Sequence, residues 1–161
     1  MDYLEYNRWF ESEFSRLKLP SDCTTDCSPE VNVTSSLFWT FHWNLIFSDN
    51  KYLRIWEHHG KKSGLQDSCR IRFAFHYGIC VKRDPNGMPV YESSDPVDIR
   101  IDNIHESAHV HYGKTYPRHP QSVVKGLLLD NLDMFIFIRA IIKHRNTGKP
   151  IAETLGFQLG N

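Results

Sequence analysis

The sequence lacks any long hydrophobic run. A membrane-spanning helix needs about 20 consecutive apolar residues, whereas the most hydrophobic segment, Met134–Ile142, is much shorter and contains Arg139. The first residues, MDYLEYNRWF, are acidic and amphipathic and lack the apolar stretch of a secretory signal. We therefore expect a cytoplasmic protein that does not interact with membranes.

An excess of charge of either sign is also absent. Lysine and arginine together number 19, as do aspartate and glutamate, so the formal net charge is zero. A broadly basic nucleic-acid surface is therefore excluded, although a local patch is not. The 4 cysteines are too few for a disulfide scaffold. With 40% hydrophobic and 13% aromatic residues, the chain can bury a core, and we expect one domain over residues 1–161.

Apolar residues repeat with periods typical of both helices and strands. Residues 2–18 and 131–145 carry them at helical spacing, and a short helix is expected at 150–156. Between these segments, residues 35–112 alternate apolar and polar side chains in several runs. This predicts an antiparallel sheet, because the connections are too short for crossovers. The predicted fold class is α+β: a curved, mainly antiparallel sheet with an N-terminal and a C-terminal helix packed on one aromatic face.

The clearest strand is predicted over residues 71–81, where every odd position is apolar. A DPNG turn sequence follows at 84–87, so we expect Met88–Glu92 to fold back on that strand. The even positions, which include Arg72 and His76, should lie on the face away from the helices.

Histidines and charged residues cluster in the segment Asp98–His119. Arg100 and Asp102 alternate with apolar residues on one predicted strand, and His109 and His111 project from the same side of the next. If the register brings both pairs to the open face of the sheet, two imidazoles lie beside a carboxylate and a guanidinium. That combination suits acid–base chemistry on a phosphate or the binding of a divalent metal.

The pattern R-x-D-N-x-H-x-x-x-H-x-H over residues 100–111 resembles the TumE-like family of toxin–antitoxin systems, whose members carry R-aromatic-D-N followed by H-x-H. The matching residues are Arg100, Asp102, Asn103, His109 and His111. Ile101 stands where an aromatic is usual. The order of strands, motif and C-terminal helix over residues 70–145 is also similar. The resemblance implies a small cytoplasmic toxin encoded with a DNA-binding antitoxin.

Our leading hypothesis is an RNA-cleaving toxin that uses paired histidines and no metal or other cofactor. His109 and His111 would act as general base and acid. Arg100 would hold the phosphate, and Asp102 would orient one imidazole. The residues assigned to substrate binding are His105, Tyr112, Tyr116, Arg118, Arg72 and His76. The expected partners are RNA and the cognate antitoxin.

Two alternatives stay open. In the first, His109, His111 and Asp102 bind a divalent metal such as zinc or manganese together with His105 or His119, and the protein is a metal-dependent hydrolase or oxygenase. In the second, the protein is a non-enzymatic inhibitor that binds a partner protein. An exposed Trp56 and the loop at 58–62 would then form the contact surface.

Overall fold

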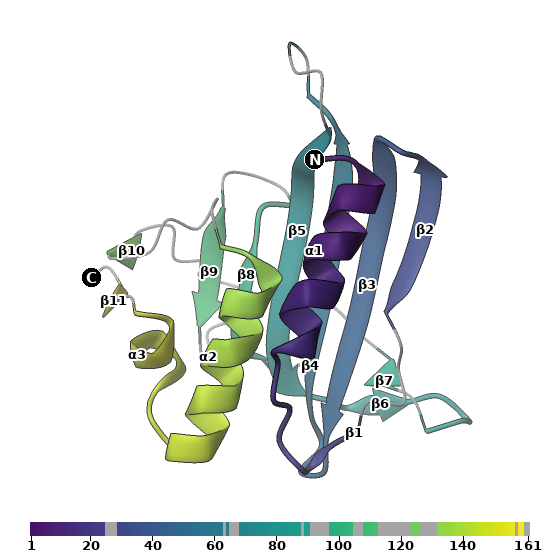
Figure 1. The fold of residues 1–161 in the computed structure, drawn as a ribbon. Helices are drawn as coiled ribbons and strands as arrows, with labels where there is room; N and C mark the ends of the chain where they lie inside the picture. The colour runs from purple at the N-terminus through teal and green to yellow at the C-terminus, as the bar shows by residue number, and fades with distance from the viewer. Residues whose placement is uncertain are drawn as a thin grey trace.

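The computed structural model describes residues 1–24, 29–62, 64, 68–87, 89–90, 97–104, 108–112, 124–125, 132–156 and 158–159. A seven-stranded antiparallel sheet dominates it, in the order β1-β3-β4-β5-β8-β9, with β2 also paired to β3 (Figure 1). Its strands are β1 (Cys23–Thr24), β2 (Glu30–Ser35), β3 (Phe38–Phe47), β4 (Lys51–Lys61), β5 (Ser68–Ile79), β8 (Val97–Asp102) and β9 (His109–Tyr112). The helices described with it are α1 (Tyr3–Ser15), α2 (Met134–Thr147) and α3 (Ile151–Leu155). The α+β fold predicted from the sequence is confirmed.

The sheet begins earlier in the chain than the alternation predicts. β1 pairs with the end of β3, at Ile46 and Phe47, and β2 pairs with its first half. Every residue of β2 is exposed. Such an edge strand has no inward row of apolar side chains, so a hydrophobic pattern cannot reveal it.

The expectation that Met88–Glu92 returns along the strand at 71–81 is wrong for the part of this segment that the structure describes. β7 (Pro89–Val90) pairs instead with β6 (Lys82–Arg83) in a separate two-stranded sheet. Both edges of β5 are already taken, by β4 and β8, so the turn at 84–87 pairs only the residues beside it. A further pair, β10 (Val124–Lys125) with β11 (Gln158–Leu159), was not predicted.

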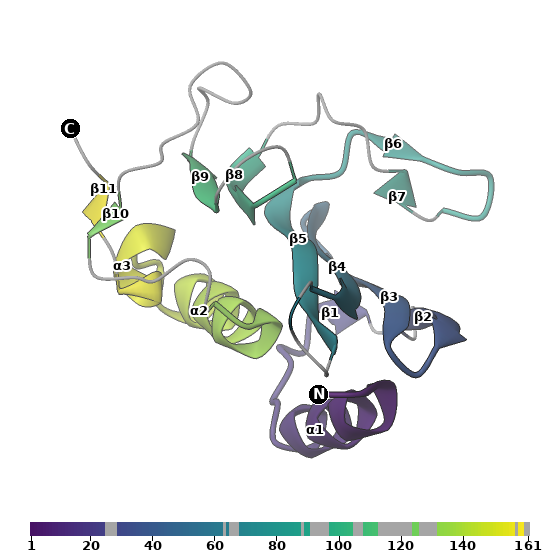
Figure 2. The ribbon, with the colours of Figure 1, turned by 90° about the horizontal axis from the view of Figure 1, so that it is seen from above.

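The helices α1 and α2 lie on the same side of the sheet (Figures 1 and 2). Phe10 of α1 packs on Phe41 of β3 with ring centroids 5.2 Å apart, and Phe137 of α2 packs on Phe75 of β5 at 5.6 Å. The helices also touch each other, since Phe10 lies 5.4 Å from Phe135. The aromatic side chains at alternate strand positions therefore form the core, as predicted. No helix in the described ranges is long and apolar enough to cross a membrane.

A buried cluster of polar side chains interrupts this apolar core. The Glu57 carboxylate, on the inward side of β4, accepts a hydrogen bond from the Tyr6 hydroxyl at 2.8 Å and one from Arg70 Nη1 at 3.0 Å. His59 Nε2 lies 2.9 Å from the same carboxylate. Burial alone raises the pKa of Glu57, but His59, Arg70 and Tyr6 outweigh it and hold the pKa below its ordinary value. Burial, with the Glu57 charge, raises the pKa of Tyr6.

Helix ends are set by capping residues that shift them from the predicted limits. The Asp2 side chain accepts a hydrogen bond from the backbone N–H of Glu5, and the Glu5 side chain accepts one from the backbone N–H of Asp2. This capping box makes α1 begin at Tyr3. The Asp133 carboxylate accepts from the backbone N–H of Ile136, so α2 begins at Met134, three residues later than expected from the sequence. The helix then ends at Gly148, whose φ of 69° is left-handed.

We expect Gly148→Ala to destabilise the protein by about 1 kcal/mol. A Cβ at this position meets nothing within 4 Å, so the cost comes only from the left-handed backbone. Asparagine tolerates that backbone better than alanine does, so Gly148→Asn should lose less stability. Urea unfolding of both variants measures the difference. Equal losses would contradict the backbone explanation.

Candidate functional site

The pairing of β8 with β9 assembles the predicted residues. Asp102 stands opposite His109, and Arg100 stands opposite His111. The short connection between the strands resets the odd–even alternation, so these four side chains share the sheet face away from the helices. The predicted register of β8 and β9 is therefore confirmed. The catalytic roles assigned to these residues stay predictions.

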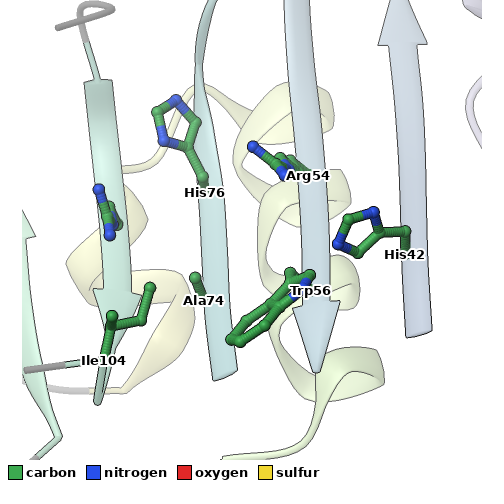
Figure 3. A pocket seen from close by; sticks show the side chains of 7 residues that line it. His42, Arg54, Trp56, Ala74, His76 and Ile104 are labelled. Atoms are coloured by element: carbon green, nitrogen blue, oxygen red, sulfur yellow. The ribbon is translucent and has the colours of Figure 1, made fainter. Parts of the chain in front are cut away.

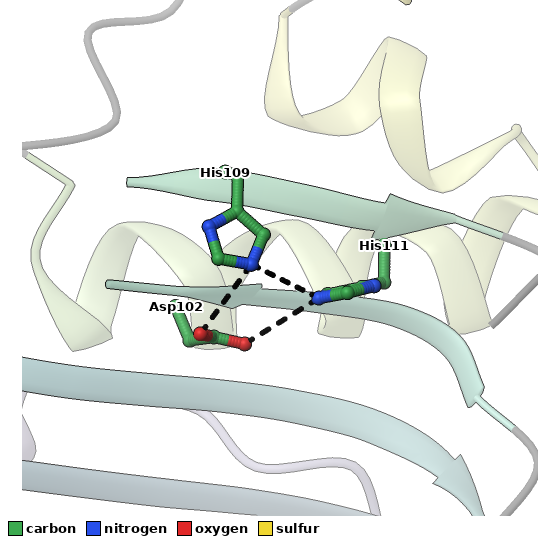
Figure 4. A group of neighbouring side chains, drawn as sticks. All are labelled: Asp102, His109 and His111. Atoms are coloured by element: carbon green, nitrogen blue, oxygen red, sulfur yellow. Dashed lines mark hydrogen bonds and ion pairs between the residues drawn. The ribbon is translucent and has the colours of Figure 1, made fainter. Parts of the chain in front are cut away.

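The two imidazoles and the carboxylate converge on one point (Figure 4). His109 Nε2 lies 3.1 Å from His111 Nε2 and 3.6 Å from Asp102 Oδ1. His111 Nε2 lies 3.8 Å from Asp102 Oδ2. Among the residues that the structure describes, this is the one set of three His, Cys, Asp or Glu side chains whose ligand atoms lie close enough to hold a metal ion, all within 4.8 Å of one another.

These separations fit a small divalent cation. Zinc lies about 2.0–2.2 Å from nitrogen and oxygen ligands, so two ligands at tetrahedral or octahedral angles are about 2.8–3.6 Å apart. The 3.1 Å between the two Nε2 atoms and the 3.6 Å from His109 to Asp102 Oδ1 lie in or at the edge of this range, while His111 approaches the other carboxylate oxygen, Oδ2, at 3.8 Å. Three protein ligands leave further coordination positions for water or substrate, as in catalytic rather than structural zinc sites.

The carboxylate of Asp102 is fixed by its surroundings. Its Oδ2 forms an ion pair with Arg100 Nε at 2.6 Å, and its Oδ1 accepts a hydrogen bond from the backbone N–H of Ile104 at 3.2 Å. Asp102 is 1% exposed. Such contacts orient a carboxylate that serves as a ligand.

His111 is held in its neutral form. Burial lowers its pKa to about 4, helped by His109 and Arg100, while the Asp102 charge acts in the opposite direction. At neutral pH this imidazole therefore carries no positive charge. The neutral ring is the form that has a lone pair for a metal ion.

A cavity of about 210 Å³ adjoins the cluster on the same face (Figure 3). The residues that line it are His42, Arg54, Trp56, Ala74, His76, Arg100 and Ile104. Arg100 belongs both to this lining and to the ion pair with Asp102. It is therefore the physical link between the cavity and the His–Asp cluster.

The strand register explains how the cavity and the cluster are joined. One row of facing residues crosses five strands from β3 to β9: Asn44, Arg54, His76, Arg100 and His111. The neighbouring row is His42, Trp56, Ala74, Asp102 and His109. Each row ends in one of the two histidines. The small Ala74 side chain leaves a depression in the second row, between Trp56 and Asp102.

The other residues predicted for substrate binding are distributed differently. His76 is buried and lines the cavity. Arg72 lies opposite His58, is exposed, and is not part of the cavity lining. Tyr112 pairs with Ile99 at the end of β9. The remaining predicted residues lie outside the described ranges: His105, Tyr116, Arg118 and His119.

The sequence reasoning did not assign Arg54 or Trp56 to the same site as the histidines. The signal was present, since both occupy even positions of the strand that pairs with residues 71–81. Carrying the alternation across the hairpin places them beside His76 and Ala74. No family model, curated protein or solved structure matches the chain.

Proposed function

We propose that the protein is a divalent-metal-dependent hydrolase of phosphate esters, with Asp102, His109 and His111 as the metal ligands. The observation that carries the proposal is the convergence of three buried residues whose possible ligand atoms lie within 4.8 Å of one another. The proposal takes up the metal alternative of the sequence analysis. His119, suggested there as a fourth ligand, lies outside the described residues.

The chemistry divides between the cation and the chain. A bound divalent cation would supply an acidified water molecule and polarise a phosphate oxygen. Arg100 presents a guanidinium between the ligands and the cavity, where it would bind the negatively charged phosphate. In the overall hydrolysis, a P–O bond to the water oxygen would form as the P–O bond to the leaving alcohol breaks, and the proton that the water loses would be balanced by one that the leaving oxygen gains from solvent.

The spacing of the imidazoles favours this proposal over the metal-independent one. A base and an acid that cleave RNA in line must stand on opposite sides of the phosphorus. His109 and His111 instead touch each other, with their Nε2 atoms 3.1 Å apart. A phosphate fits between them only if one imidazole moves, whereas a metal ion needs both where they are.

We also propose a substrate and a biological context. RNA is the phosphate ester that the resemblance to TumE-like toxins suggests, with a DNA-binding antitoxin as partner. The cationic residues beside the site support an anionic substrate, but they do not distinguish RNA from other phosphate esters.

Metal content and cleavage together test the proposal. We expect purified protein, stripped with chelator and titrated with zinc or manganese, to bind one ion per chain by calorimetry and mass spectrometry. Cleavage of a fluorescent single-stranded RNA and of bis(4-nitrophenyl) phosphate should stop in chelator and return with the metal. Cleavage that continues in chelator would support the metal-independent mechanism instead. Absence of both binding and cleavage would favour the protein-binding alternative.

A further inference from the structure

The cavity beside the His–Asp cluster has the chemistry of a nucleotide site. It combines a half-buried indole, Trp56, with two guanidiniums, those of Arg54 and Arg100. We propose that it binds a nucleoside monophosphate unit, with the base against Trp56 and the phosphate beside Arg100. The inference rests on the proposed function, since it names the substrate class of that same site.

The positive charges of Arg54 and Arg100 favour an anionic ligand in the cavity. Among the described residues that line it, two are arginines and none is acidic, although Asp102 beside the cavity pairs with Arg100. His76 lies between the two arginines, and burial, together with the charges of Arg100 and Arg54, lowers its pKa to about 3. A phosphate placed here gains two charge-assisted contacts in a partly desolvated setting.

The aromatic side chain of Trp56 favours a planar group next to that anion. Trp56 extends over the space beside Ala74 (Figure 3), and its neighbour across the strands is the imidazole of His42, with ring centroids 6.3 Å apart. An indole face stacks on any nucleobase. A bare phosphate would leave this aromatic surface uncovered.

The strand spacing sets the length of ligand that spans the site. Neighbouring strands lie about 4.8 Å apart, so Trp56 on β4 is about 10 Å from Asp102 on β8, two strands away. A single nucleotide unit, with its base at one end and its phosphate at the other, covers most of that distance. Its phosphate would then lie beside the guanidinium of Arg100, next to the ion pair that this residue forms with Asp102.

Calorimetry with adenosine 5′-monophosphate tests the inference on chelator-treated and zinc-loaded protein. We expect both forms to bind it, and to bind it at least about tenfold more tightly than adenosine or inorganic phosphate.

Trp56→Ala should weaken binding at least about tenfold, because it removes the stacking surface. Ala74→Leu should do the same by filling the depression. All variants should keep one zinc per chain. Arg54→Ala should also weaken nucleotide binding, because it removes one of the two guanidiniums. Arg8→Ala, at an exposed arginine on α1, is its charge-matched control and should bind normally.

The outcomes separate this inference from the proposed function. Zinc binding without nucleotide binding in either form overturns the nucleotide site and leaves the metal centre standing. Nucleotide binding without zinc binding overturns the metal centre and supports the cavity. Equal affinity for inorganic phosphate and the nucleotide, or unchanged affinity in Trp56→Ala, contradicts the stacking role.

Discussion

Replacing His109 or His111 with alanine should lower the affinity for zinc at least about 100-fold. Each imidazole supplies one of three protein ligands, and even the loss of an outer partner of a ligand usually costs 10–100-fold. Cleavage of phosphate esters should fall to the level seen in chelator. Titration of metal-free protein with zinc measures the affinity, and the RNA and bis(4-nitrophenyl) phosphate assays measure the activity.

The matched control is His144→Ala, which removes a histidine on α2 that contacts the backbone oxygen of Lys149. It should bind zinc normally. Circular dichroism of the metal-free variants checks that the sheet is intact, which separates loss of a ligand from loss of the fold. If both His109→Ala and His111→Ala still bind one zinc at the original affinity, the ion lies elsewhere and the proposed centre is wrong.

Replacing Arg70 with methionine should destabilise the protein by about 3 kcal/mol at neutral pH. The change keeps an aliphatic side chain but removes the guanidinium, which donates to Glu57 and lies 4.2 Å from the ring centroid of Phe73. A buried carboxylate is then left with Tyr6 and His59 alone. Urea unfolding gives the loss. The double variant Glu57→Gln/Arg70→Met should regain most of it, because no buried charge remains to be compensated.

The pH dependence of the free energy of unfolding is a second test of the role of Arg70. In the wild type the pKa of Glu57 is lowered, so its stabilising contribution is complete above the ordinary glutamate pKa and is lost as pH falls through the lowered value. Without Arg70, burial should raise the pKa of Glu57 instead. Acidification from pH 8 to 5 should therefore narrow the stability gap between wild type and Arg70→Met. A gap that stays constant over this range would show that the Glu57 charge is not the cause.

Much of the fold could be read from the sequence because its signals are periodic. The alternation along residues 38–47 and at 71–81 identified strands: the odd positions from Trp39 to Phe47 and from Phe73 to Tyr77 are buried, whereas Ile79 and Val81 are exposed. The same parity placed His109 and His111 on the face of Arg100 and Asp102. β2 escaped notice because all of its residues are exposed. Alternation of apolar and polar residues shows which side of a strand is buried. An edge strand that is exposed to solvent on both sides has no such alternation.

The finer features of the site depend on distances that no pattern contains. The sequence left open whether the two imidazoles flank a phosphate or meet at a cation, because both need only a shared face. The 3.1 Å contact between them is such a distance, and it supports the cation in our proposal. The Glu57 cluster was missed for a related reason: its members lie on α1, β4 and β5, and only the packing of the helix on the sheet brings Tyr6 to the other two strands.

The position of β9 links metal supply to the integrity of the sheet. β9 has four residues and, among the strands that the structure describes, stands last in the order and pairs with β8 alone. An edge strand this short opens at little cost to the rest of the protein. In our proposal, however, it carries two of three ligands, so opening it requires releasing the ion. Metal starvation would then loosen this edge before any global unfolding, and the hydrogen-exchange protection of its amides would depend on free cation concentration.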